Sequence, residues 1–157
     1  MWLLNSTTES SLWILFFTIA ASFYNPRKKI NSVYEEYAKS IGLSYTGLYV
    51  LHMIALGENC TQKYIAEQMY LPKQTVNSVI SSFCKQGLIE LTELPEDRRH
   101  KALHLTEKGQ EFAGKILPQI EQAEHRSMEQ FDDDERELLF RLIKKYSNTF
   151  EKELLQK

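Results

Sequence analysis

The chain has 157 residues, of which 43% are hydrophobic and 25% charged, with a formal net charge of −2. This length suits one domain with a substantial core, and the near-neutral charge argues against a surface that is basic throughout, leaving room for a local basic patch. Cys60 and Cys84 are the only cysteines. They have no metal-ligand spacing between them and suit a reducing compartment.

The segment from Leu12 to Tyr24 is almost entirely apolar. It is shorter than the ~20 residues of a membrane span, and it lacks the basic start of a signal peptide because Glu9 is the only charge before it. A helix that is apolar all round is buried, so the pattern predicts a dimerisation helix rather than a membrane anchor. Pro26 removes a backbone hydrogen bond and should kink or break this helix.

Two further helices are expected before the central motif. A basic cluster at 27–29 is either a solvated turn or an auxiliary phosphate contact. The apolar periodicity predicts helix over 30–41 and again over 45–56. Ser44 should cap the second of these helices, and Gly57 should end it.

A helix-turn-helix pattern follows. Thr61 is placed to cap a short helix that runs to Met69, and Pro72 marks a turn because its ring fits only the start of the next helix. That next helix carries one apolar stripe, formed by Val76, Val79, Ile80 and Phe83. Such a stripe packs on a core.

The remaining positions of this second helix are small and polar, with no carboxylate: Lys73, Gln74, Thr75, Asn77, Ser78, Ser81 and Ser82. These side chains suit base edges and phosphates in a major groove. An ordinary solvated helix face is the alternative interpretation.

A hairpin completes the motif. Gly87 should end the helix in the left-handed conformation, and strands are expected over 88–94 and 101–105 on either side of a polar turn. Arg98 and Arg99 lie in that turn. A narrow minor groove attracts inserted arginine, so the hairpin is predicted to be a DNA-binding wing.

Three motifs together resemble the MarR family of transcriptional regulators: Leu71 with Thr75-Val76 and Lys85-Gln86-Gly87-Leu88-Ile89, then Pro95-Glu96-Asp97-Arg98-Arg99, then Leu105-Thr106-Glu107-Lys108-Gly109. The resemblance implies a mainly α fold with a small antiparallel β-wing. The winged helix-turn-helix region would cover residues 44–105, between dimerisation helices in 1–41 and 106–157.

The resemblance also assigns roles to the wing and to the turn. Arg99 would enter the minor groove, with Asp97 as its salt-bridge partner. Many members have a serine where Pro72 stands, so this chain should lack that N-cap bond, and Thr75 and Asn77 should carry more of the DNA contact.

Members of this family often bind small aromatic effectors beside the DNA-reading lobe, and the helix over 45–56 resembles one wall of such a site. Its candidate ligand-binding residues are Tyr45, Tyr49, His52 and Met53. Core packing of these aromatic side chains is the alternative, and it is the one that helical spacing favours.

The C-terminal region should form two long helices. Thr106 is placed to cap the first, through residue 130, and Pro118 should kink it. Asp132 and Glu135 have the spacing of a capping box for the second. A long apolar stripe on that last helix predicts burial against a second copy of the chain: Leu138, Leu139, Leu142, Ile143, Tyr146, Phe150 and Leu154.

No catalytic constellation, metal-ligand set or cofactor motif is visible, so neither an enzyme nor a cofactor is expected. Cys60 and Cys84 have no feature that would lower a thiol pKa, which makes redox sensing the weaker interpretation. The sequence therefore predicts a cytoplasmic, homodimeric regulator, expected to be a repressor, that binds a palindromic operator and is released by a small molecule. The rival is a winged-helix module for protein contact or membrane association.

Overall fold

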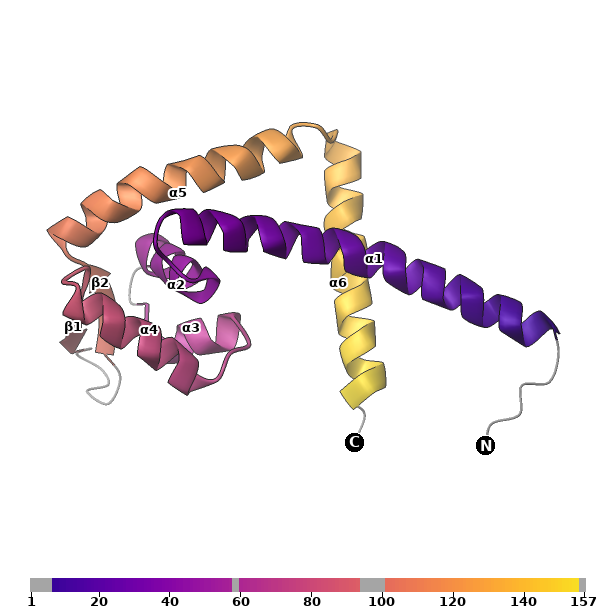
Figure 1. Ribbon diagram of the computed structural model, residues 1–157, viewed down its shortest axis with the longest axis horizontal. Helices are drawn as coiled ribbons and strands as arrows, with labels where there is room; N and C mark the ends of the chain where they lie inside the picture. Colours follow the sequence, from indigo (N-terminus) through magenta and orange to yellow (C-terminus); the bar gives the residue numbers. More distant parts are fainter. Residues whose placement is uncertain (1–6, 58–59, 94–100, 156–157) are drawn as a thin grey trace. The chain divides into compact units, whose positions relative to one another are not determined.

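The computed structural model describes residues 7–57, 60–93 and 101–155, with side chains from Tyr24 onward. It confirms a mainly α fold with one small antiparallel sheet. The chain forms two compact units, Met1–Gln110 and Glu111–Lys157. Figure 1 shows the elements, which in chain order are α1 (Thr7–Ser40), α2 (Tyr45–Leu56), α3 (Gln62–Gln68), α4 (Lys73–Lys85), β1 (Ile89–Glu93), β2 (Lys101–Leu105), α5 (Glu107–Met128) and α6 (Asp133–Leu155).

Helix α1 continues through Pro26 over 34 residues. The predicted break at this proline is therefore wrong. Proline removes a single N–H from the backbone ladder, and the turns on both sides keep their own hydrogen bonds. The described side chains near this point remain exposed, among them Tyr24, Ile30 and Val33.

The core of the first unit lies between α2, α3, α4 and the sheet, which together we call the reading head (residues 45–105). Leu51, Ile65, Val76 and Leu103 are among its fully buried side chains. The predicted stripe of α4 is confirmed, because its apolar members face this core and only Val79 is half-buried.

The predicted caps of the reading head form as expected. Ser44 Oγ accepts a hydrogen bond from the Gly47 amide at 3.0 Å, and Thr61 Oγ1 accepts one from the Tyr64 amide at 3.1 Å. Gly87 ends α4 at φ 69°. Gly57 ends its helix as predicted, with φ −106°.

The turn between α3 and α4 contains a strained residue. Tyr70 adopts φ 52°, and its side chain is 93% exposed. The Leu71 amide donates to the Ala66 carbonyl at 3.0 Å, which closes α3. A left-handed backbone conformation costs a non-glycine residue roughly 1–2 kcal/mol. The conformation of Tyr70 therefore lowers the stability of this turn.

The sheet pairs β1 and β2 in antiparallel register, with Ile89 opposite Leu105 and Glu93 opposite Lys101. The segment before α3 joins its edge, because the Leu103 amide donates to the Cys60 carbonyl at 2.7 Å. The hairpin is thereby fastened to the start of the helix-turn-helix motif.

In the second unit, the capping box of α6 forms as predicted. The Asp132 amide donates to Glu135 Oε2 at 3.0 Å, and the Glu135 amide donates to Asp132 Oδ1 at 2.9 Å. Helix α5 runs through Pro118. Helix α6 has no buried residue, and most of its apolar stripe is exposed.

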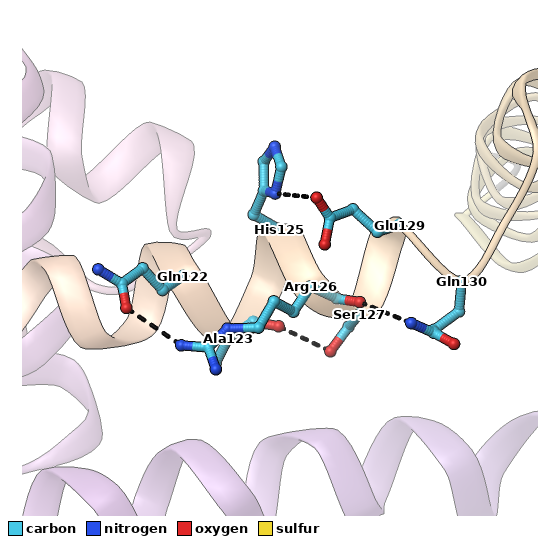
Figure 2. Close-up of polar contacts among 7 residues, drawn as sticks. All are labelled: Gln122, Ala123, His125, Arg126, Ser127, Glu129 and Gln130. Atoms are coloured by element: carbon cyan, nitrogen blue, oxygen red, sulfur yellow. Dashed lines mark hydrogen bonds and ion pairs between the residues drawn. The ribbon is translucent and has the colours of Figure 1, made fainter.

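The last turns of α5 are largely exposed and are supported by contacts along the helix (Figure 2). His125 Nδ1 lies 3.2 Å from Glu129 Oε1, and Arg126 donates to Gln122 Oε1 at 3.1 Å. Pairs four residues apart stabilise a solvated helix by a few tenths of a kcal/mol each. This segment can therefore remain helical without burying an apolar face.

Among the helices that the structure describes, none contains a stretch that is long and apolar enough to cross a membrane.

Candidate nucleic-acid interface

The outer face of α4 is available to a ligand over its whole length. All seven polar side chains predicted for it are exposed: Lys73, Gln74, Thr75, Asn77, Ser78, Ser81 and Ser82. The opposite face packs in the core, and this packing fixes which side of α4 faces the solvent. Ser78 Oγ donates to the Gln74 carbonyl at 3.0 Å, which leaves the hydroxyl oxygen of Ser78 as an acceptor.

The start of α4 is held by a contact that the sequence did not reveal. Pro72 makes no side-chain cap bond, as expected. Gln62 Nε2, from the first turn of α3, instead donates to the Lys73 carbonyl at 3.0 Å. This bond links the two helices of the motif at the start of α4.

The end of α4 is held by the residues that open α5. Lys108 Nζ donates to the Gln86 carbonyl at 2.7 Å. Thr106 Oγ1 donates to the Gly87 carbonyl at 2.7 Å and accepts from the Gly109 amide at 3.0 Å. A lysine near the last carbonyls of a helix also complements its negative end.

Gly109 explains the last position of the Leu-Thr-x-x-Gly motif. A Cβ at this position would lie 1.9 Å from the Leu88 carbonyl oxygen, which no side chain could tolerate without backbone movement. The motif thus builds a tight joint between the end of α4 and the start of α5.

The strands of the wing lie as predicted, but its tip is outside the described residues. Asp97, Arg98 and Arg99 all belong to that tip, so their predicted roles stay predictions. At the base of the wing, Lys101 is exposed.

A hollow of about 250 Å³ separates α4 from the base of the wing. Its lining comes from α3, α4 and both strands, and comprises Thr61, Gln62, Lys63, Asn77, Ile80, Leu91, Lys101 and Leu103. Of these residues, the sequence predicted Asn77 as a DNA contact, Thr61 as a cap and Ile80 as part of the apolar stripe of α4.

The four candidate effector residues are only partly brought together. Tyr45 and Tyr49 pack with ring centroids 5.9 Å apart and line an open hollow of about 230 Å³ beside the turn after α3. His52 and Met53 do not line it. Burial raises the pKa of the Tyr45 phenol, and the nearby Tyr49 and Glu35 raise it further, so this hydroxyl is a neutral donor.

The cysteines lie in different surroundings. Cys60 is buried and Cys84 is half-buried, and both are free thiols. Burial raises the pKa of the Cys60 thiol, which reduces its thiolate fraction at neutral pH. Within the described ranges, no group of histidine, cysteine or acidic side chains could hold a metal ion.

Comparison with known proteins identifies the family. The family model described as MarR family matches residues 41–100. The transcriptional regulator SarZ of Staphylococcus epidermidis is 31% identical over 101 residues, which cover 64% of this chain and 68% of SarZ. The chain belongs to the MarR family. It is thus a DNA-binding transcriptional regulator with a winged helix-turn-helix.

Solved MarR-family structures share the fold. NMB1585, a MarR family regulator from Neisseria meningitidis, superimposes with a TM-score of 0.74 at 30% identity and covers 86% of this chain and 96% of its own. The S. aureus MepR–DNA complex gives a TM-score of 0.68 at 16% identity, covering 83% of this chain and 96% of MepR. At that lower identity the likeness concerns the fold alone.

Proposed function

We propose that this MarR-family chain acts as a homodimeric repressor, that α4 and the wing read a palindromic operator, and that a small molecule releases it. The outer face of α4 is the observation that supports a DNA-reading role. It is exposed, polar and free of carboxylates over its whole length. Such a face presents donors and acceptors to base edges and has no negative group to repel phosphates.

The contacts to bases are assigned to the residues that follow Lys73 on this face, a phosphate contact to its start, and the minor-groove contacts to the wing. Asn77 can pair with adenine through two hydrogen bonds, and Gln74, Thr75, Ser78 and Ser81 can supply single ones. Lys73 is a phosphate contact. Arg98 and Arg99 are assigned to the minor groove, with Asp97 orienting Arg99 through a salt bridge.

The homodimer is supported by α6. Its apolar stripe is exposed in the single chain, and contiguous apolar patches of this kind mark protein interfaces. Two-fold symmetry would place the two α4 helices about one turn of DNA apart, ~34 Å, on a palindromic operator. Because the ligand is chromosomal DNA, the proposal also places the protein in the cytoplasm.

The effector is assigned to the hollow lined by Tyr45 and Tyr49. Tyr49 is exposed and Tyr45 is half-buried, and their rings offer a stacking surface for a small aromatic molecule. A ligand that binds better to the arrangement of the dimer that fits the operator poorly shifts the population toward that arrangement and so lowers operator affinity. His52 and Met53 are not assigned to this hollow.

The experiment that tests the proposal is fluorescence anisotropy on two DNA duplexes across a salt series. One duplex carries the DNA upstream of the protein's own gene, and the other carries the same bases scrambled. We expect tighter binding to the natural sequence, with an affinity that falls steeply with salt because phosphate contacts release counterions. Weak binding with the same affinity for both duplexes would favour a protein-interaction module instead.

Replacement of the wing arginine is the most direct variant. Arg99→Ala should weaken operator binding by about 1–3 kcal/mol without unfolding the protein. Arg141→Ala, which removes an arginine from α6, is the matched control and should leave operator affinity unchanged. An unaltered affinity for Arg99→Ala in a gel-shift titration would remove the arginine from the interface.

A further inference from the structure

The hollow between α4 and the wing has a chemistry unlike that of the α4 face. Its apolar lining consists of the buried Ile80 and Leu103 and the exposed Leu91, and Lys63 and Lys101 add two exposed ammonium groups. Amide and hydroxyl groups of Gln62, Thr61 and Asn77 lie among them. The hollow therefore combines an apolar surface, neutral hydrogen-bonding groups and two cations.

The position of the hollow determines which part of a bound DNA duplex can occupy it. If α4 enters the major groove and the wing enters the neighbouring minor groove, one sugar–phosphate strand must pass between them, because that strand is what separates the two grooves. The hollow lies between α4 and the strands that carry the wing. It is thus the place that this strand would cross.

We propose that this hollow is a seat for a phosphodiester strand, in which Lys63 and Lys101 neutralise phosphates while Leu91 packs against deoxyribose. The inference rests on the function proposed above. It adds two charged contacts from α3 and β2 to those assigned to α4 and to the tip of the wing. A lysine ammonium suits this task because it attracts phosphate as a compact point charge.

Each of these lysines has a carboxylate neighbour in the free protein. Lys63 Nζ lies 3.9 Å from Glu67 Oε1, and both side chains are more than half exposed. Glu93 is the cross-strand partner of Lys101 and projects from the same face of the hairpin. An exposed pair at this distance contributes little, so phosphate can compete with both carboxylates. The two acids should therefore weaken DNA binding.

The test measures the salt dependence of DNA binding for single-residue variants. Lys63→Gln and Lys101→Gln should each lower the slope of log K against log salt by about 0.9 per protomer, hence by about 1.8 per dimer. Both should weaken binding to natural and scrambled duplexes by the same factor, because phosphate contacts carry no sequence information. Glu67→Gln and Glu93→Gln should change affinity in the opposite direction.

Lys115→Gln is the matched control. Lys115 is exposed and pairs with Glu111 four residues away, as Lys63 does with Glu67, but it lies on α5. Its replacement should leave the slope unchanged. Thermal unfolding of each variant, compared with the parent, checks that the fold is intact.

The outcomes separate the two proposals. If the parent protein does not discriminate the natural duplex from the scrambled one, the proposed function fails. If it does discriminate and both Lys63→Gln and Lys101→Gln keep the parental slope, only the phosphodiester seat is overturned. A reduced slope in both variants, with an unchanged ratio between the two duplexes, supports it.

Discussion

The reading head and α6 both carry apolar stripes, yet only the reading head buries its stripe within one chain. Val76 of α4 has no exposed surface, whereas Leu142 and Ile143 of α6 are exposed. Burial of apolar surface contributes about 25 cal/mol per Å², so the reading head gains its stability from its own core. Helix α6 buries none of its residues, and its apolar stripe is the surface that we propose for the dimer interface.

The largest effect should come from a cavity in the reading head. Leu51→Ala should lower the free energy of unfolding by about 2–5 kcal/mol, because Leu51 is fully buried and its neighbours cannot fill the space. Leu142→Ala on α6 is the control and should cost less than about 0.5 kcal/mol at protein concentrations where the chain is monomeric. Urea unfolding measures both, and equal losses would erase the contrast between the two regions.

The next effect concerns association. Ile143→Glu should raise the dimer dissociation constant about thirtyfold, or about 2 kcal/mol, because it places a charge in the proposed interface. Sedimentation equilibrium measures this constant. Asn148→Glu introduces the same charge on the opposite side of the helix and should leave this constant unchanged. If Ile143→Glu remains as dimeric as the parent, the stripe of α6 does not form the interface.

A smaller effect should appear where the reading head ends. Thr106→Val removes the hydroxyl that donates to the Gly87 carbonyl and caps Gly109. It should lower stability by about 1–2 kcal/mol, and Thr106→Ser should restore most of the loss. Differential scanning calorimetry can compare the two. A parental melting temperature for Thr106→Val would mean that the joint adds nothing to the reading head.

The smallest effect should be a gain. Tyr70→Gly should raise the free energy of unfolding by about 0.5 kcal/mol, since glycine adopts φ 52° without strain, although it loses more backbone entropy on folding. Tyr70→Ala keeps the backbone penalty and should show no gain. A destabilised Tyr70→Gly would indicate that the exposed ring contributes contacts that outweigh its strain.

The sequence predicted those features that depend on residues close together in the chain. The caps at Ser44, Thr61 and Thr106 formed as expected, because a cap needs only a side-chain oxygen and an amide two or three positions later. The apolar stripe of α4 was equally local, since helical periodicity alone determines which side faces a core.

These local patterns could not predict the contacts between different helices and strands. The bond from Gln62 to the Lys73 carbonyl and that from Lys108 to the Gln86 carbonyl join residues 11 and 22 positions apart. Nothing in their spacing distinguishes them from other exposed polar residues. The predicted break at Pro26 was wrong for a related reason. The prediction considered one missing N–H and left out the hydrogen bonds of the turns on both sides of the proline.

Gly109 also determines how the first turn of α5 is held against the residues that follow α4. Its missing Cβ lets the first turn of α5 sit against the Leu88 carbonyl, so a rotation of that turn is passed directly to the rest of the helix. Helix α5 has 22 residues and is therefore ~33 Å long at 1.5 Å per residue. A tilt of about 5° at the joint would displace its far end by ~3 Å.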